Sequence, residues 1–112
     1  MKTKEDKVYN LLTKIPKGKV TTYGKIAKKL GISAREVGRI LSKNEHPDKF
    51  PCYKVVRSDG SLGGYTIGNR NDSSTLEIKK KKLISDNVKF NKDKVDKSCI
   101  YYYFIDKEIR FT

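Results

Sequence analysis

The sequence predicts a mainly α-helical domain with small β elements, built as a winged helix-turn-helix with a β-hairpin at its C-terminal end. Apolar residues recur at helical spacing in the first half of the chain, and Gly or Pro separates the periodic segments. The second half holds short β-branched or aromatic runs beside turn residues. At 112 residues the chain suits one domain with a modest core. We therefore expect residues 1–97 to form this domain and residues 98–112 to form a hairpin that extends it.

The first helix is expected over residues 4–15, "KEDKVYNLLTKI". Its apolar positions share one face: Val8, Leu11, Leu12 and Ile15. The "PKGK" that follows ends this helix, because Pro and Gly disfavour its continuation.

Two shorter helices are expected next. In the first, Thr22 is a suitable N-cap and Gly31 a natural stop. In the second, Ser33 can serve as the cap, with Glu36 at the capping-box spacing. The inner faces of the two helices are formed by Ile26, Ala27, Leu30, Val37, Ile40 and Leu41.

Two such helices joined by a tight glycine turn make a helix-turn-helix, in which the second helix enters a groove of DNA. We expect the small residues Ala27 and Gly38 to let the helices pack closely, which leaves Arg35 and Arg39 on the outer face. An ordinary helical hairpin is the alternative interpretation.

The second half of the sequence predicts a β-hairpin wing after the helix-turn-helix and one more helix. "KVV" and then "SDGSLGGY" indicate a strand, a turn and a second strand, and residues 66–75 a polar loop. A helix is expected over residues 76–87, with its lysine run on a solvated face. Its candidate core positions are Leu76, Ile78, Leu83 and Ile84. The final "CIYYYFIDKEIRFT" predicts a hairpin around an "IDKE" turn.

Charge is the dominant feature of the composition. Twenty-six Lys and Arg against thirteen acidic residues leave a formal net charge of +13. The excess is spread over both halves of the chain, which favours a folded basic surface that binds a polyanion such as DNA. A general lysine bias is the alternative. The sequence contains no apolar run of membrane-spanning length and no signal-peptide pattern, so we expect a cytoplasmic or nucleoid-associated protein.

The two cysteines lie far apart, which suits neither a disulfide framework nor a zinc site, and no metal is expected. Cys99 lies inside an apolar run and is expected to be a buried structural residue. Cys52 follows Pro51 and precedes Tyr53 and Lys54, just after the segment that would meet DNA. Positive charge and backbone donors favour the nucleophilic thiolate, so Cys52 is the candidate for chemistry on the nucleic acid itself.

Four segments resemble, in order and spacing, the active domain of O6-alkylguanine-DNA alkyltransferases, which are methylated-DNA–protein-cysteine methyltransferases. They are "IPKGKVTTYGKIAKKLG", "SAREVGRILSKN", "PCYKVVRSDGSLGGY" and "DNVKFNKDKVD", and the resemblance runs from about residue 5 to residue 97. It implies repair of alkylated DNA by direct reversal. A monomer would bind the minor groove of double-stranded DNA and flip the damaged nucleotide. Cys52 would then keep the alkyl group irreversibly, without a cofactor.

The resemblance also implies roles for residues at the reacting centre. Tyr23 would crowd the target phosphate and donate a proton to the leaving guanine, and Asn44 would support the turn that carries Cys52. The backbone around Val55 would recognise the base edge. Tyr65 and Thr66 would lie over the base, Thr66 replacing a usual serine. Tyr23 and Tyr65 could instead be half-buried core aromatics.

Other residues are expected to meet the duplex. Arg35 matches an arginine finger that fills the space of the flipped base, and Arg39 could instead be an exposed solubilising charge. The residues expected to contact DNA are Thr22, Tyr23, Ser33, Arg35, Arg39 and Lys54.

The motif departs from the family in one important place. The family reads Pro-Cys-His-Arg, whereas this chain reads "PCYK". The missing histidine relays a proton, and Tyr53, with an ordinary pKa of about 10, is a poorer base. Tyr53 stays a candidate catalytic residue, because its hydroxyl could still hydrogen-bond a water or the thiolate. Lys54 could lower the pKa of Cys52 through its charge. Asp86 takes the position of the family's catalytic glutamate, and His46 is read as a loop residue.

Two further departures keep other functions open. Full-size family members carry an additional N-terminal domain, and the alkyltransferase-like proteins, which bind alkylated guanine without transfer, consist of the DNA-binding domain alone. The retained Cys52 favours the enzyme. A non-catalytic damage sensor, a winged-helix regulator and one part of a split or fused repair protein are the alternatives.

Overall fold

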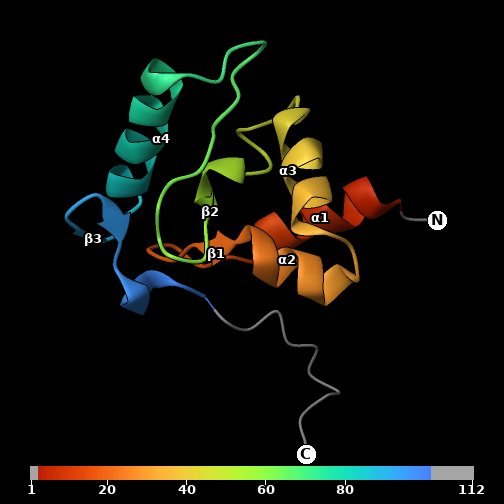
Figure 1. The fold of residues 1–112 in the computed structure, drawn as a ribbon, viewed down its shortest axis with the longest axis horizontal. Helices are drawn as coiled ribbons and strands as arrows, with labels where there is room; N and C mark the ends of the chain where they lie inside the picture. Colours follow the sequence, from red (N-terminus) through yellow and green to blue (C-terminus); the bar gives the residue numbers. More distant parts are fainter. Residues whose placement is uncertain (1–2, 102–112) are drawn as a thin grey trace, which may run out of the picture.

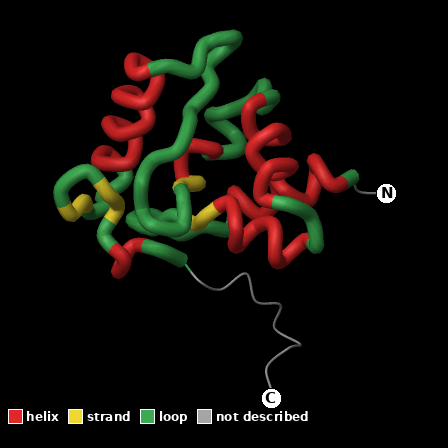
Figure 2. The backbone as a smooth tube through the Cα atoms, viewed as in Figure 1, coloured by secondary structure: helices red, strands yellow, loops and turns green. Residues whose placement is uncertain are grey.

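The computed structural model describes residues 3–101. Its helices are α1 (Lys4–Leu12), α2 (Tyr23–Leu30), α3 (Ala34–Ser42) and α4 (Ser73–Ser85). Its short strands are β1 (Thr21–Thr22), β2 (Val55–Val56), β3 (Phe90–Asn91) and β4 (Lys94–Val95). Helices α1 to α3 gather on one side, α4 and β3 lie on the other, and β1 and β2 lie between them (Figures 1 and 2). The predicted class, mainly α with small β elements, is confirmed.

The first helix is held by the cap that its sequence encodes. Thr3 and Asp6 form a capping box, because each side chain accepts a hydrogen bond from the other residue's backbone N–H. Helix α1 ends at Leu12, three residues before the expected end. Ile15 nevertheless stays buried, so the apolar face continues into the turn.

The helix-turn-helix forms as its caps predict. The Thr22 hydroxyl accepts from the N–H of Lys25, and the Ser33 hydroxyl accepts from the N–H of Glu36. Gly31 ends α2 in the left-handed conformation, with φ +72°.

One expectation about the packing of these helices was wrong. Ala27 is buried as expected, but a Cβ added at Gly38 would meet nothing within 4 Å. Gly38 is therefore not a close helix contact. It borders the open cavity described below.

The wing differs from the prediction in its pairing. β2 pairs in parallel with β1, with Thr21 opposite Val55 and Thr22 opposite Val56, so the expected second strand after the turn does not form. The turn itself is present, closed by the N–H of Gly60 donating to the carbonyl of Arg57. Beyond it the backbone is irregular, because carbonyls that could enter a strand ladder accept hydrogen bonds from the side chain of Lys79.

Helix α4 begins earlier than expected and buries a different face. Asp72 caps it by accepting from two backbone N–H groups, so the helix starts at Ser73, inside the predicted loop. Leu76 and Leu83 face the core as predicted, whereas Ile78 and Ile84 are 41% and 54% exposed.

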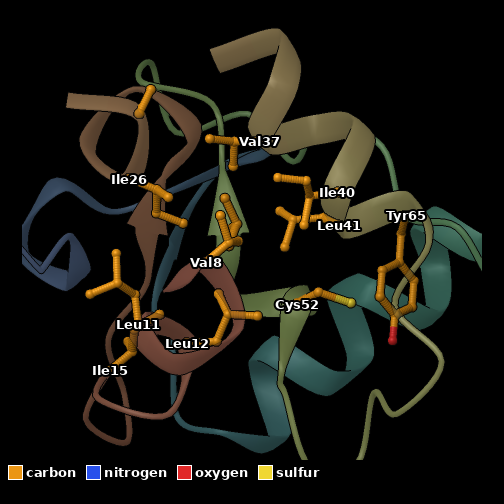
Figure 3. Close-up of a cluster of buried hydrophobic side chains, with 12 residues drawn as sticks. Val8, Leu11, Leu12, Ile15, Ile26, Val37, Ile40, Leu41, Cys52 and Tyr65 are labelled. Carbon is orange, nitrogen blue, oxygen red and sulfur yellow. The ribbon is translucent and has the colours of Figure 1, made fainter. Parts of the chain in front are cut away.

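The core consists of two clusters. The larger one joins α1, α2 and α3 to Cys52 and Tyr65 (Figure 3). The smaller one packs β2, α4 and the segment that follows α4. Tyr53 touches both clusters, so the residue after the cysteine lies at their junction.

The segment after α4 completes the second cluster. β3 and β4 form an antiparallel hairpin that the sequence reading missed. A Cβ at Gly60 would lie 2.8 Å from the carbonyl oxygen of Val95, so the wing turn packs directly on this hairpin. Cys99 is buried, and its sulfur accepts a hydrogen bond from the N–H of Lys89. This agrees with the expectation that Cys99 is a buried structural residue.

The last described residues pair with the backbone just before β1. Val20 donates to the carbonyl of Cys99 and accepts from the N–H of Tyr101. Residues 102–112, the greater part of the predicted C-terminal hairpin, lie outside the described residues. No helix within residues 3–101 combines the length and the apolar character needed to cross a membrane.

Candidate active site

A cavity of about 730 Å³ opens beside Cys52. Its walls come from the start of α2, from α3, from the turn that carries Cys52 and from residues 57–66. The predicted site residues that border it are Tyr23, Arg35, Cys52, Tyr65 and Thr66. The fold thus brings together residues that lie as far as 43 positions apart in the sequence.

Cys52 begins the 3-10 turn η1 (Cys52–Lys54) and is 8% exposed. Its sulfur points toward the Tyr65 ring (Figure 3). Asn44 bridges the chain before this turn, because its amide donates to the carbonyl of Phe50 at 2.8 Å and its oxygen accepts from the N–H of His46 at 2.9 Å. Burial raises the pKa of the Cys52 thiol, and the hydrogen bond from Asn44 and the charge of Lys79 oppose that rise.

Lys79 is the largest departure from the predicted site. The sequence predicts a solvated face for the lysine run, but Lys79 is fully buried. Its ammonium donates to three carbonyls, those of Val55 at 2.7 Å, Leu62 at 2.5 Å and Gly64 at 3.0 Å. Three acceptors match the three N–H groups of an ammonium.

The charge of Lys79 is coupled to that of the cysteine. Burial lowers the pKa of Lys79 to about 7, while the nearby Cys52 favours the protonated amine. A Cys52 thiolate and a Lys79 ammonium therefore stabilise each other. The Lys79 ammonium also lies 5.9 Å from the centre of the Tyr23 ring, which borders the cavity.

Two tyrosines line the cavity, and both keep their phenol proton at neutral pH. Burial raises the pKa of Tyr23, and burial followed by the charge of Cys52 raises the pKa of Tyr65 to about 12. Both phenols are hydrogen-bond donors at neutral pH. Tyr23 lies against the backbone of Gly63, where an added Cβ would be 3.1 Å from its hydroxyl oxygen.

Tyr53 does not border the cavity. The ammonium of Lys82 lies 5.6 Å from the centre of its ring, and burial together with the charge of Asp86 raises its pKa. A phenol in this environment is not a base at neutral pH. The step that a histidine would perform at this position is therefore not available to Tyr53.

Lys54 and Asp86 form a buried ion pair at 2.9 Å. Lys54 also donates to the carbonyl of Pro16, and Asp86 accepts from the N–H of Gly18. The expected contact of Lys54 with DNA is not supported by this geometry, because its ammonium is enclosed and points at Asp86. The pair instead ties the cysteine turn to the end of α4 and to the turn after α1.

The other residues expected to contact DNA differ in their surroundings. Arg35 borders the cavity near the start of α3. The hydroxyls of Thr22 and Ser33 are occupied as helix caps. Arg39 binds Glu36 at 2.6 Å and lies 3.7 Å from Glu5, outside the cavity lining.

Val55 differs from the expectation that its backbone meets the base. It is fully buried, its carbonyl accepts from Lys79, and it does not border the cavity. Asn71 and Arg57, which sequence reasoning missed, do border it. A signal for Lys79 was present, since it follows Leu76 by three positions and precedes Leu83 by four, on the same helix face. We find no comparable signal for Asn71.

Residues 3–88 match the family model described as "6-O-methylguanine DNA methyltransferase, DNA binding domain". The chain belongs to this family. Its members are DNA repair proteins that act on alkylated guanine, and the match includes every predicted site residue.

Two curated archaeal relatives illustrate the extent of the match. The chain is 43% identical over 91 residues to a bifunctional methyltransferase/endonuclease of Picrophilus torridus, covering 80% of this chain and 28% of that protein. It is 47% identical over 78 residues to a methylated-DNA–protein-cysteine methyltransferase of Pyrobaculum aerophilum, covering 70% and 48%. The chain thus spans about half or less of these relatives.

Two solved structures share the fold. Schizosaccharomyces pombe Atl1, solved with damaged DNA containing O6-carboxymethylguanine, superposes with a TM-score of 0.66 at 29% identity, covering 81% of this chain and 83% of Atl1. The O6-methylguanine-DNA methyltransferase of Pyrococcus kodakaraensis gives a TM-score of 0.65 at 40% identity, covering 79% and 48%.

Proposed function

We propose that this chain repairs DNA by moving an alkyl group from O6-alkylguanine onto Cys52, irreversibly and once per molecule. The observation that carries the proposal is a buried cysteine at the wall of a cavity of about 730 Å³, facing one tyrosine and coupled to a buried lysine. A base extruded from the duplex suits such a cavity, because a stacked guanine does not offer its O6 substituent to a side chain. Family membership and the DNA-bound structure of Atl1 support the same class of substrate.

In the proposed reaction the Cys52 thiol loses its proton to solvent in the open cavity, and the resulting thiolate attacks the alkyl carbon. An S–C bond forms as the bond between that carbon and guanine O6 breaks, and the electron pair stays on the guanine. Tyr23 is the proposed donor of the proton that neutralises the departing base, because it borders the cavity and its phenol is protonated at neutral pH. The Lys79 ammonium supports the thiolate before attack. The thioether is stable, so the protein is consumed, and the reaction needs no cofactor.

We further propose that a monomer binds double-stranded DNA through the helix-turn-helix, with α3 in the minor groove. Arg35 is the proposed residue that fills the gap left by the extruded base, because it lies near the start of α3 and borders the cavity. The net charge of +13 favours association with the phosphate backbone.

A non-catalytic sensor of alkylated guanine is the second candidate. Two observations favour it: Tyr53 cannot take the thiol proton at neutral pH, and burial raises the pKa of Cys52 itself. The cysteine retained at the cavity wall and the archaeal relatives named as methyltransferases favour the enzyme.

The two candidates differ in what happens to the lesion. A duplex carrying one O6-methylguanine is incubated with increasing amounts of the full chain, and the nucleosides released by digestion are quantified. Transfer predicts that one lesion reverts to guanine per protein molecule added, and that Cys52→Ala binds the duplex but repairs nothing. Lesion-selective binding with no loss of O6-methylguanine would overturn the enzyme in favour of the sensor.

A further inference from the structure

We propose that Asn71 is a positioning residue for alkyl transfer, and that it acts by fixing the backbone that presents Tyr65 to Cys52. The inference rests on the proposed function. Asn71 stands at the end of the loop between Tyr65 and α4, and its side chain borders the same cavity as Cys52.

Asn71 holds one side of a single peptide group. Its Oδ1 accepts a hydrogen bond from the N–H of Tyr65 at 3.2 Å. The carbonyl of the same peptide group belongs to Gly64 and accepts from the Lys79 ammonium at 3.0 Å. With both polar groups of the peptide bound, its plane cannot rotate without breaking a hydrogen bond, so the direction in which Tyr65 leaves the backbone is fixed.

The close contact with Gly64 supports the same role. A Cβ added at Gly64 would lie 2.9 Å from Nδ2 and 3.1 Å from Oδ1 of Asn71, so the amide lies directly on the glycine backbone. Only a residue without a side chain leaves room for this arrangement.

Hydrogen bonds within the loop of residues 66–71 bring Asn71 back to the backbone of Tyr65. Ile67 and Arg70 exchange both of their backbone hydrogen bonds, at 2.9 and 3.0 Å. Beyond Asn71 the chain enters α4 through the cap residue Asp72, whose carboxylate also lies 3.3 Å from Arg70. The loop is therefore anchored at both ends.

The fixed backbone determines where the Tyr65 ring lies in the cavity. Tyr65 is 5% exposed, and the Cys52 sulfur points toward its ring (Figure 3). A base that enters the cavity must be held against this ring for the alkyl carbon to reach the sulfur. Small errors in the placement of a reacting group slow a reaction strongly. Asn71 thereby influences transfer without touching the reacting atoms.

Three variants of the full chain test the inference. Asn71→Ala removes the acceptor, Asn71→Asp keeps an oxygen in its place, and Asn69→Ala is the matched control in the same loop. Asn69 does not border the cavity that holds Cys52. Each variant is mixed with duplex carrying one O6-methylguanine, and the maximal transfer rate at saturating DNA is separated from the apparent Kd. Thermal melting checks the fold.

We expect Asn71→Ala to lower the maximal rate about tenfold while leaving affinity for undamaged duplex unchanged, as the loss of one hydrogen bond implies. Asn71→Asp should recover most of the rate at saturating DNA, and Asn69→Ala should match the wild type. The proposed role of Asn71 Oδ1 as acceptor would be overturned if Asn71→Ala transferred at the wild-type rate. It would also be overturned if Asn71→Ala and Asn71→Asp lost the same fraction of the maximal rate. If the wild type transfers nothing, the proposed function fails. The inference is then judged on the ratio of affinities for damaged and undamaged duplex, which Asn71→Ala must lower.

Discussion

Replacing Lys79 with methionine should destabilise the fold and make Cys52 less reactive. Methionine keeps the length and packing of the buried stem but removes the ammonium that donates to three carbonyls. A hydrogen bond to a charged group contributes about 1.5–3 kcal/mol, and a buried acceptor left without a partner costs about 1–3 kcal/mol. Removing a buried ammonium also removes its desolvation cost, so we expect a net loss of about 2–4 kcal/mol in the free energy of unfolding.

The assay is urea unfolding, compared with Lys81→Met, an exposed neighbour on the same helix. The control should change the free energy of unfolding by less than about 0.5 kcal/mol. Reaction of Cys52 with a small alkylating reagent should also slow in Lys79→Met, because the charge that favours the thiolate is gone. Equal stability of the two variants would refute the reasoning.

The same lysine makes stability depend on pH in a defined direction. Its pKa is about 7 in the folded chain and near 10.5 when it is exposed. Between these values the unfolded chain holds more protons, so the contribution of Lys79 to the free energy of unfolding rises with pH from about 7 to about 10.5. The difference between the wild type and Lys79→Met should therefore increase over this range. A constant difference would show that the amine keeps its ordinary pKa in the fold.

Three other substitutions test separate parts of the site. Lys54→Met should destabilise the fold by about 3 kcal/mol, because it leaves the largely buried Asp86 carboxylate without its ion pair, and urea unfolding measures the loss. Gly63→Ala should cost about 1–3 kcal/mol and slow transfer, because φ is +73° and the new Cβ would press on Tyr23. Tyr53→His should raise the transfer rate at neutral pH several-fold, because imidazole, with a pKa of about 6.5, can accept the thiol proton.

Each of these has a matched control. Lys17→Met removes an exposed lysine and should leave stability unchanged. Gly31→Ala has the same left-handed backbone, φ +72°, but meets nothing within 4 Å, so it reports the backbone strain alone. Tyr53→Phe removes the hydroxyl without adding a base. The first prediction is contradicted if Lys54→Met is as stable as Lys17→Met. The second is contradicted if Gly63→Ala and Gly31→Ala have equal effects. The third is contradicted if Tyr53→His transfers no faster than Tyr53→Phe.

The helix-turn-helix was predictable because its signals are local. Thr22 and Ser33 cap the helices through hydrogen bonds to residues three positions away, and Gly31 ends α2 through its own backbone conformation. Such features depend on neighbours in the sequence and not on the rest of the fold.

The remaining features depend on contacts between distant segments. The parallel pairing of Thr21 with Val55 joins two-residue strands 34 positions apart, and no pattern in either strand specifies it. Lys79 was misread because a run of lysines suggests solvent, although its spacing from Leu83 placed it on the buried face. The expected contact of Lys54 with DNA failed for a related reason, since the sequence does not show that Asp86 encloses its charge.

The most direct test of the account is the mass of the intact protein after incubation with duplex carrying a single O6-methylguanine. The account predicts a gain of one methyl group in place of one proton, located on the peptide that contains Cys52 and absent in Cys52→Ala, while Cys99→Ala gains the same mass. An unchanged mass after lesion-selective binding, or a methyl group located on Cys99, would contradict the claim that Cys52 is the acceptor.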